Sequence, residues 1–148
     1  KGLHMIKTNN DRLKHLIYYS VPTTFDEETI EEILLKSRQN NAQSNVTGAL
    51  ICRSDLYFQY LEGPIDEVNK TFKKIELDNR HKNIQKIKED ETTRRLFASW
   101  AMRDDPVKSW MWTRTEVKAG ILNGIKPKEA FEAFERLSRE VDQFDQEL

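Results

Sequence analysis

The alternation of strand-like and helix-like patterns is the feature that most limits the fold of this 148-residue chain. An apolar segment over residues 13–19 ends near Pro22, which has no N–H to donate to a neighbouring strand. Thr24 and Glu27 then have the spacing of a capping box, and apolar residues repeat at helical spacing as far as about Asn40. These patterns predict a strand followed by an amphipathic helix.

The middle of the chain predicts a β-hairpin and a second helix. Residues 46–52 and 56–61 are two apolar segments, and the short polar sequence between them is typical of a turn. Pro64 follows the hairpin, and proline suits the first position of a helix because the N–H it lacks is not needed there. Apolar residues then repeat at helical spacing up to Ile75, which predicts a second amphipathic helix.

Two further segments complete a sheet. Ile84 and Ile87 lie in a charged segment that we expect to be a fourth strand, and the apolar residues from Leu96 to Met102 indicate a fifth. The order β-α-β-β-α-β-β predicts an α+β fold, a ferredoxin-like sheet of five mixed strands with two helices on one face. The space between the helices and the sheet is the expected ligand site.

The C-terminal segment, residues 104–148, is expected to be a helical cap or output segment beside a sheet domain of residues 13–103. Pro127 can open a last helix, in which apolar residues recur at heptad spacing. The apolar positions are Ala130, Phe134, Leu137, Val141, Phe144 and Leu148. Two interpretations stay open: this stripe packs on the open face of the domain's own sheet, or it forms a dimer or relay helix.

Composition and charge exclude several classes of protein. The chain has 24 Lys and Arg against 25 Asp and Glu, so it lacks the overall positive charge of a nucleic-acid-binding protein, and we expect no direct nucleic-acid partner. Cys52 is the single cysteine, which excludes an intramolecular disulfide. The longest apolar run, Gly48 to Cys52, is far shorter than the roughly 20 residues of a membrane span, so we expect a cytoplasmic protein without a membrane partner. Residues 1–12 are expected to be a tag remnant and an N-terminal extension.

The usual signatures of enzymes are missing from the sequence. The three histidines and the single cysteine have no metal-ligand spacing, and no glycine-rich phosphate loop or nucleophile elbow is present. Neutral hydrogen-bonding residues instead occur where apolar ones are expected, notably Tyr18 in the first strand, Asn40 and Asn41 at the end of the first helix, and Gln59 in an aromatic strand. Such residues either bridge groups within a core or bind a ligand, because a buried glutamine has up to four hydrogen-bonding positions to satisfy.

Six spaced motifs connect these residues. They are Tyr18-x-Ser20, Ser37-x-x-Asn40-Asn41, Val46-Thr47-Gly48, Phe58-Gln59-x-Leu61-Glu62-Gly63, Asp78-x-Arg80-His81 and Trp100-x-Met102. In this order and spacing they resemble the BLUF family, sensors of blue light using FAD, across about residues 13–103. The resemblance implies the fold predicted above, with FAD bound non-covalently between the two helices and with FMN or riboflavin as substitutes.

The resemblance also implies roles for individual residues in holding the flavin. Asn40 and Asn41 would meet the polar edge of the ring, and Ile33 and Ile75 would enclose its two faces. The other cofactor-binding residues that it implies are Tyr18, Ser20, Gln59, Lys74, Asp78, Arg80 and His81. Lys74 stands where an arginine is common, so it would offer a point charge in place of a planar fork.

The light reaction that the resemblance implies depends on Tyr18 and Gln59. The excited flavin takes an electron from the Tyr18 phenol, a proton follows through the Gln59 amide, and that amide ends rotated or tautomerised. Glutamine suits this role because its two ends have nearly the same shape but opposite hydrogen-bonding character. Trp100 and Met102, on the expected fifth strand, would pass the change to the C-terminal helices. The sequence leaves open which of these two side chains points inward.

Other function classes remain open at this point. They are a flavin-dependent oxidoreductase and a flavin-free interaction module on the same ferredoxin-like frame. We expect a photosensor without turnover of its own, acting on an effector domain or partner protein that the sequence does not identify. Self-association into a homodimer or higher oligomer is expected through the sheet face or the C-terminal helix. Tyr19 and Tyr60 are additional phenols near Tyr18 that would offer side routes for electron transfer.

Overall fold

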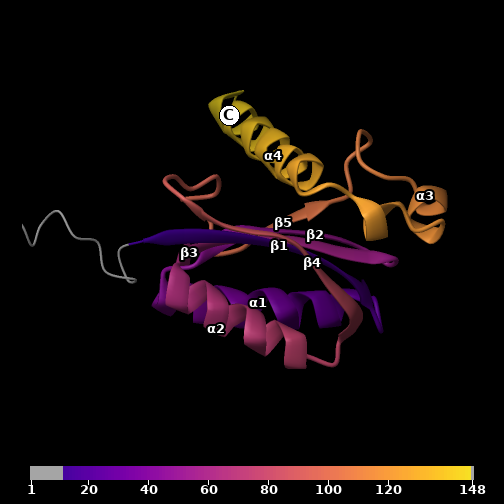
Figure 1. The fold of residues 1–148 in the computed structure, drawn as a ribbon, viewed down its shortest axis with the longest axis horizontal. Helices are drawn as coiled ribbons and strands as arrows, with labels where there is room; N and C mark the ends of the chain where they lie inside the picture. The colour runs from indigo at the N-terminus through magenta and orange to yellow at the C-terminus, as the bar shows by residue number, and fades with distance from the viewer. Residues whose placement is uncertain (1–11, 148) are drawn as a thin grey trace, which may run out of the picture.

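The computed structural model describes residues 12–147, which form a five-stranded sheet with helices on both faces (Figure 1). The strands are β1 (Leu13–Pro22), β2 (Thr47–Arg53), β3 (Leu56–Pro64), β4 (His81–Thr92) and β5 (Arg103–Pro106). They lie in the order β4-β1-β3-β2-β5, and the first four have the order of a ferredoxin-like sheet. Neighbouring strands are antiparallel except β2 and β5, which are parallel. The predicted α+β class and mixed sheet are therefore confirmed.

The helices divide between the two faces of the sheet. Figure 1 shows α1 (Glu27–Ser44) and α2 (Ile65–Leu77) side by side on one face, as predicted. The last helix, α4 (Pro127–Glu147), crosses the opposite face and begins at the predicted proline. The short helix α3 (Arg114–Lys118) and the 3-10 turn η2 (Ile121–Gly124) lie in the connection that leads to it.

The start of α1 differs from the predicted capping box at Thr24. Asp26 is the N-cap, and its side chain accepts a hydrogen bond from the backbone N–H of Thr29 at 2.7 Å. An aspartate satisfies one of the free N–H groups of the first turn in this way and also stabilises the positive end of the helix. The helix continues four residues beyond the predicted end at Asn40, to Ser44, and stops at Asn45 in the left-handed conformation.

The fifth strand lies later in the sequence than predicted. Residues 93–102 are a loop, and β5 begins at Arg103, so Trp100 and Met102 precede the strand. The reason is the buried carboxylate of Glu62 on β3, which accepts hydrogen bonds from the backbone N–H groups of Leu96 and Phe97 at 2.7 and 2.8 Å. Those N–H groups are then not available to a sheet ladder. The strand also crosses the predicted boundary between residues 103 and 104.

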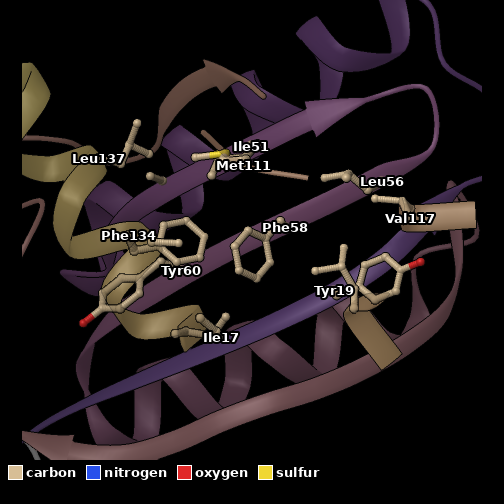
Figure 2. Packing of buried hydrophobic residues seen from close by; sticks show 14 of the residues in the cluster. Ile17, Tyr19, Ile51, Leu56, Phe58, Tyr60, Met111, Val117, Phe134 and Leu137 are labelled. Carbon is tan, nitrogen blue, oxygen red and sulfur yellow. The ribbon is translucent and has the colours of Figure 1, made fainter. Parts of the chain in front are cut away.

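The two faces of the sheet carry separate cores, because successive strand residues point to opposite sides. On the α4 side, Phe58 and Tyr60 of β3 pack against Phe134, with ring centroids 4.6 and 5.4 Å apart (Figure 2). Ala130, Phe134 and Leu137 of α4 are fully buried there. This confirms that the apolar stripe packs on the domain's own sheet, as far as its side chains are described; those of residues 141–148 lie outside the described part.

The position of α4 also bears on the predicted self-association. One of the two predicted dimer surfaces was the sheet face, and α4 covers one face of the sheet within this chain (Figure 1). Self-association through the sheet face or the C-terminal helix stays a prediction. Among the helices of residues 12–147, none has the length and apolar character needed to cross a membrane.

Candidate functional site

A cavity of about 750 Å³ lies between the sheet and the helices α1 and α2, and residues of β1, β2, β3, the turn after α2 and the start of β4 also line it. This volume is in the range of small-molecule and cofactor sites. Of the sequence-predicted residues, those that line it are Tyr18, Ile33, Asn40, Asn41, Gln59, Lys74, Ile75, Asp78, Arg80 and His81. Ser20, Trp100 and Met102 are the predicted residues that lie outside the lining.

Tyr18 and Gln59 face each other at the sheet wall of the cavity. They are directly paired in the register of β1 and β3, so their side chains project from the same face of the sheet. The hydroxyl of Tyr18 donates to Oε1 of Gln59, and Nε2 of Gln59 donates to Sδ of Met102 at 3.2 Å. Burial raises the pKa of Tyr18 well above its ordinary value, so this phenol is neutral in the folded protein.

Met102 points inward and Trp100 does not. Met102 is 1% exposed and belongs to the core on the α1 and α2 side, whereas Trp100 is 39% exposed. The Trp100 carbonyl accepts a hydrogen bond from the Gly48 backbone N–H at 3.1 Å, which holds the loop against β2. Of the two residues whose orientation the sequence left open, Met102 is the one that contacts Gln59.

The C-terminal part of α1 holds the segment that contains Met102. Nδ2 of Asn41 donates to the carbonyl of Ala101 at 2.9 Å, and Nε of Arg38 donates to the carbonyl of Met102 at 3.0 Å. One amide hydrogen of Asn41 is therefore committed to this segment, and its second amide hydrogen and its side-chain oxygen are the groups that it can offer to a ligand. Asn41 is buried and thus links the cavity to the chain just before β5.

Charged residues at the end of α2 close the other side of the cavity. Arg80 forms a forked ion pair with Asp78, with Nε–Oδ1 at 2.9 Å and Nη2–Oδ2 at 2.6 Å. The hydrogen bond from Arg80 holds the pKa of Asp78 below its usual range. Ser20 acts behind the lining, because its hydroxyl lies 2.7 Å from Nδ1 of His81, whose Nε2 lies 2.6 Å from the carbonyl of Ile75. Ser20 therefore orients His81 and is not itself a wall of the cavity.

The phenol that the sequence prediction missed is Tyr57. It lines the cavity from β3, two residues before Gln59 and on the same face. Tyr19 and Tyr60, the additional phenols predicted near Tyr18, instead lie in the core on the α4 side (Figure 2) and do not line the cavity. The alternation of strand residues relative to Gln59 was the signal that could have identified Tyr57.

The surroundings of the cavity suit a flat ring with one polar edge. Ile33 of α1 and Ile75 of α2 supply apolar side chains from the two helices, and the amides of Asn40 and Asn41 supply uncharged hydrogen-bonding groups. Within residues 12–147, no group of three His, Cys, Asp or Glu side chains is arranged to hold a metal ion. The fold and the cavity thus define an α+β domain with a cavity suited to an organic ligand.

Comparison with known proteins identifies the family. A family model described as BLUF, sensors of blue-light using FAD, matches residues 13–103. The solved dark-state structure of BlrB, a BLUF protein, matches with a TM-score of 0.75 and 26% identity, covering 88% of this chain and 98% of that chain. The chain therefore belongs to the BLUF family of blue-light sensors.

Two curated relatives carry further parts that this chain does not span. Photoactivated adenylate cyclase subunit alpha of Euglena gracilis is 27% identical over 104 residues, which are 68% of this chain and 10% of that protein. The blue light- and temperature-regulated antirepressor BluF of Escherichia coli (strain K12) is 37% identical over 73 residues, which are 49% of this chain and 18% of that protein. The chain thus spans less than a fifth of the length of either relative.

Proposed function

We propose that this chain is a photosensor that binds FAD non-covalently in the cavity between α1 and α2, with FMN or riboflavin as substitutes, and has no turnover of its own. The sensor comprises residues 13–103, and residues 104–148 form its cap and output segment. The observation that carries the proposal is the buried hydrogen-bonded series Tyr18–Gln59–Met102 at the wall of the cavity. Such a series of one phenol, one amide and one thioether can change its hydrogen bonds without any net reaction.

The cavity residues bind the flavin in this proposal by shape and by uncharged hydrogen bonds. Ile33 and Ile75 contact the two faces of the ring, and Asn40 and Asn41 meet its polar edge. The remaining binding residues are Lys74, Asp78, Arg80 and His81, with Ser20 orienting His81. The fit is supported by a buried polar atom of the cavity wall, the Tyr57 hydroxyl, for which the described residues supply no hydrogen-bond partner.

Tyr18 and Gln59 carry the light response. Bound flavin supplies absorption of blue light and an excited state that accepts an electron. Tyr18 gives up that electron, and its hydroxyl proton moves to Oε1 of Gln59, the atom to which it already donates. When the electron returns, a proton returns to Tyr18 as well: from Oε1, which would leave the Gln59 amide turned, or from Nε2, which would leave it tautomerised. In either form Gln59 would offer the ring a different hydrogen bond.

The turned amide changes the contact with Met102. A thioether sulfur accepts a weak hydrogen bond but has no hydrogen to donate. Once the carbonyl end of Gln59 faces Met102, the present bond from Nε2 to Sδ is lost, and Met102 is released from Gln59. Met102 lies one residue before β5, so its movement pulls on that strand, and the exposed Trp100 is the side chain that can exchange places with it.

The C-terminal segment passes the change onward. Arg103, the first residue of β5, donates to Asp105 at 2.7 Å and to the carbonyl of Leu137 on α4 at 3.4 Å. A shift of β5 is thereby transmitted to α4. An effector in the same polypeptide or a separate partner protein reads that shift, which accords with the names of the cyclase and antirepressor relatives. Self-association through the sheet face or the C-terminal helix is part of the proposal.

Absorption spectroscopy tests the proposal against its rivals. The protein purified with FAD is expected to be yellow and, under blue light, to show a small red shift of the flavin band that reverses in the dark. A flavin-dependent oxidoreductase would instead bleach and turn over with a reduced nicotinamide and an electron acceptor. Protein that stays colourless after incubation with FAD, FMN or riboflavin would refute the photosensor and leave a flavin-free interaction module.

A further inference from the structure

Among the described residues, the hydroxyl of Tyr57 is a buried hydrogen-bonding group without a partner. The residue is 3% exposed, lies on β3 and lines the cavity. Its hydroxyl oxygen makes no hydrogen bond to any side chain or backbone group among the residues that the structure describes. An unsatisfied buried hydroxyl is costly, and native proteins keep few of them without a reason.

The polar groups around Tyr57 are already engaged with each other. The ring of His81 lies 6.2 Å from that of Tyr57 between centroids, but its two nitrogens contact Ser20 and the carbonyl of Ile75. Asp78 is held in its forked pair with Arg80. The acceptor for the Tyr57 hydroxyl is therefore expected from whatever fills the cavity.

Tyr57 and Tyr18 occupy the same face of the sheet but differ in one decisive respect. The Tyr18 hydroxyl has a proton acceptor, Oε1 of Gln59, whereas the Tyr57 hydroxyl has none. Among the described residues, Tyr57 therefore has no proton route of the kind that Tyr18 has, and a group inside the cavity is left to accept its hydrogen bond. The Tyr57 hydroxyl is suited to donating a lasting hydrogen bond, in which the hydrogen stays on the phenol oxygen.

We propose that Tyr57 is a further ligand-binding residue, whose hydroxyl donates a hydrogen bond to an oxygen of the bound flavin, on the ring or on the ribityl chain. This inference rests on the proposed function, because the acceptor belongs to the flavin. Burial, the largest of several causes, raises the pKa of Tyr57 to about 12, so the hydroxyl keeps its hydrogen at neutral pH. The bond would satisfy the unpartnered hydroxyl and favour the loaded protein over the empty one.

Flavin titrations of paired variants test the proposal. Tyr57→Phe removes one oxygen and keeps the ring, and the matched control, Tyr19→Phe, removes a phenol oxygen on the α4 side of the same sheet. We expect Tyr57→Phe to weaken the affinity for riboflavin and FAD about 5- to 10-fold, the size of one hydrogen bond. We expect Tyr19→Phe to leave it unchanged. The melting temperature of the flavin-free Tyr57→Phe protein should not fall, because the hydroxyl has no partner in that state.

The outcomes separate this inference from the proposed function. Equal affinities of wild type and Tyr57→Phe would overturn the inference, as would a lowered melting temperature of the flavin-free variant with unchanged affinity. Failure of the wild type to bind any flavin would instead refute the proposed function. Lumiflavin, which lacks the ribityl chain, locates the acceptor: a weakening that persists with lumiflavin supports a ring oxygen, and one seen with riboflavin alone supports a ribityl hydroxyl.

Discussion

The hydrogen bond between Tyr18 and Gln59 can be isolated by a double-mutant cycle in the flavin-free protein. Both side chains are buried, and the Tyr18 hydroxyl donates to Oε1 of Gln59. Tyr18→Phe removes the donor, so Oε1 of Gln59 loses its hydrogen-bond donor. Gln59→Leu removes the acceptor, so the Tyr18 hydroxyl loses its hydrogen-bond acceptor. In either case a buried polar group loses its partner, which costs about 1–3 kcal/mol.

The double variant is the informative one, because it leaves neither group unsatisfied. We expect the loss of unfolding free energy in Tyr18→Phe/Gln59→Leu to be smaller than the sum of the two single losses by about 1–2 kcal/mol. For a chain of this size, each kcal/mol moves the melting temperature by about 2–4 °C. The contact of Gln59 with Met102 is absent from both Gln59 variants, so its loss cancels in the cycle.

Urea unfolding followed by circular dichroism measures the four free energies. The matched control combines Gln59→Leu with Tyr19→Phe, because Tyr19 lies on the opposite face of the sheet, and these two changes should be additive. If the Tyr18 and Gln59 changes are also additive to within about 0.5 kcal/mol, the hydrogen bond does not couple the two residues. The proposed route of the proton from Tyr18 to Gln59 would then lose its basis.

Three further predictions concern the cavity, the loop before β5 and the cap. Asn41→Ala should weaken flavin binding about 10-fold in a titration, because the polar edge loses one uncharged partner; unchanged affinity would contradict the placement. Burial raises the pKa of the Glu62 carboxyl. The folded state therefore holds the carboxyl proton more tightly than the unfolded state does, so the free energy of unfolding falls as pH rises above the ordinary pKa of glutamate. In urea unfolding across that pH range, the stability of wild type minus that of Glu62→Gln should fall with rising pH, and a constant or rising difference would refute this. A chain ending after Pro106 should aggregate in light scattering, because it uncovers Phe58 and Tyr60; a monodisperse product would contradict the packing of α4.

Local patterns were sufficient to predict most of the fold. The hairpin turn and the periodicity of both helices depend on neighbouring residues, and each lies where the sequence indicated. Pro64 lies one position earlier than predicted, as the last residue of β3 and the N-cap of α2. The position of β5 depends on Glu62, more than thirty residues earlier, whose carboxylate takes the N–H groups of Leu96 and Phe97. No pattern within residues 93–106 can reveal this contact, because Glu62 lies outside that segment. The strand was therefore predicted too early in the sequence.

The site was predicted through its motifs and refined by the geometry of the strands. Ten predicted residues line one cavity, although they come from five elements and from the turn between α2 and β4, because the family resemblance marked these positions. The inward orientation of Met102 depends on the loop before β5, which Arg38 and Asn41 hold from α1. Tyr57 was missed because its neighbours are also aromatic, and only the alternation along β3 separates it from Phe58.

The most direct test of the central claim is the light-minus-dark absorption difference of the FAD-loaded protein, compared between wild type and Tyr18→Phe. The wild type should show a reversible red shift of the flavin band. Tyr18→Phe keeps the ring of the side chain and should still bind flavin, but without the phenol it should show no red-shifted state. A Tyr18→Phe protein that binds flavin and shifts its band as the wild type does would contradict the account of the photosensor.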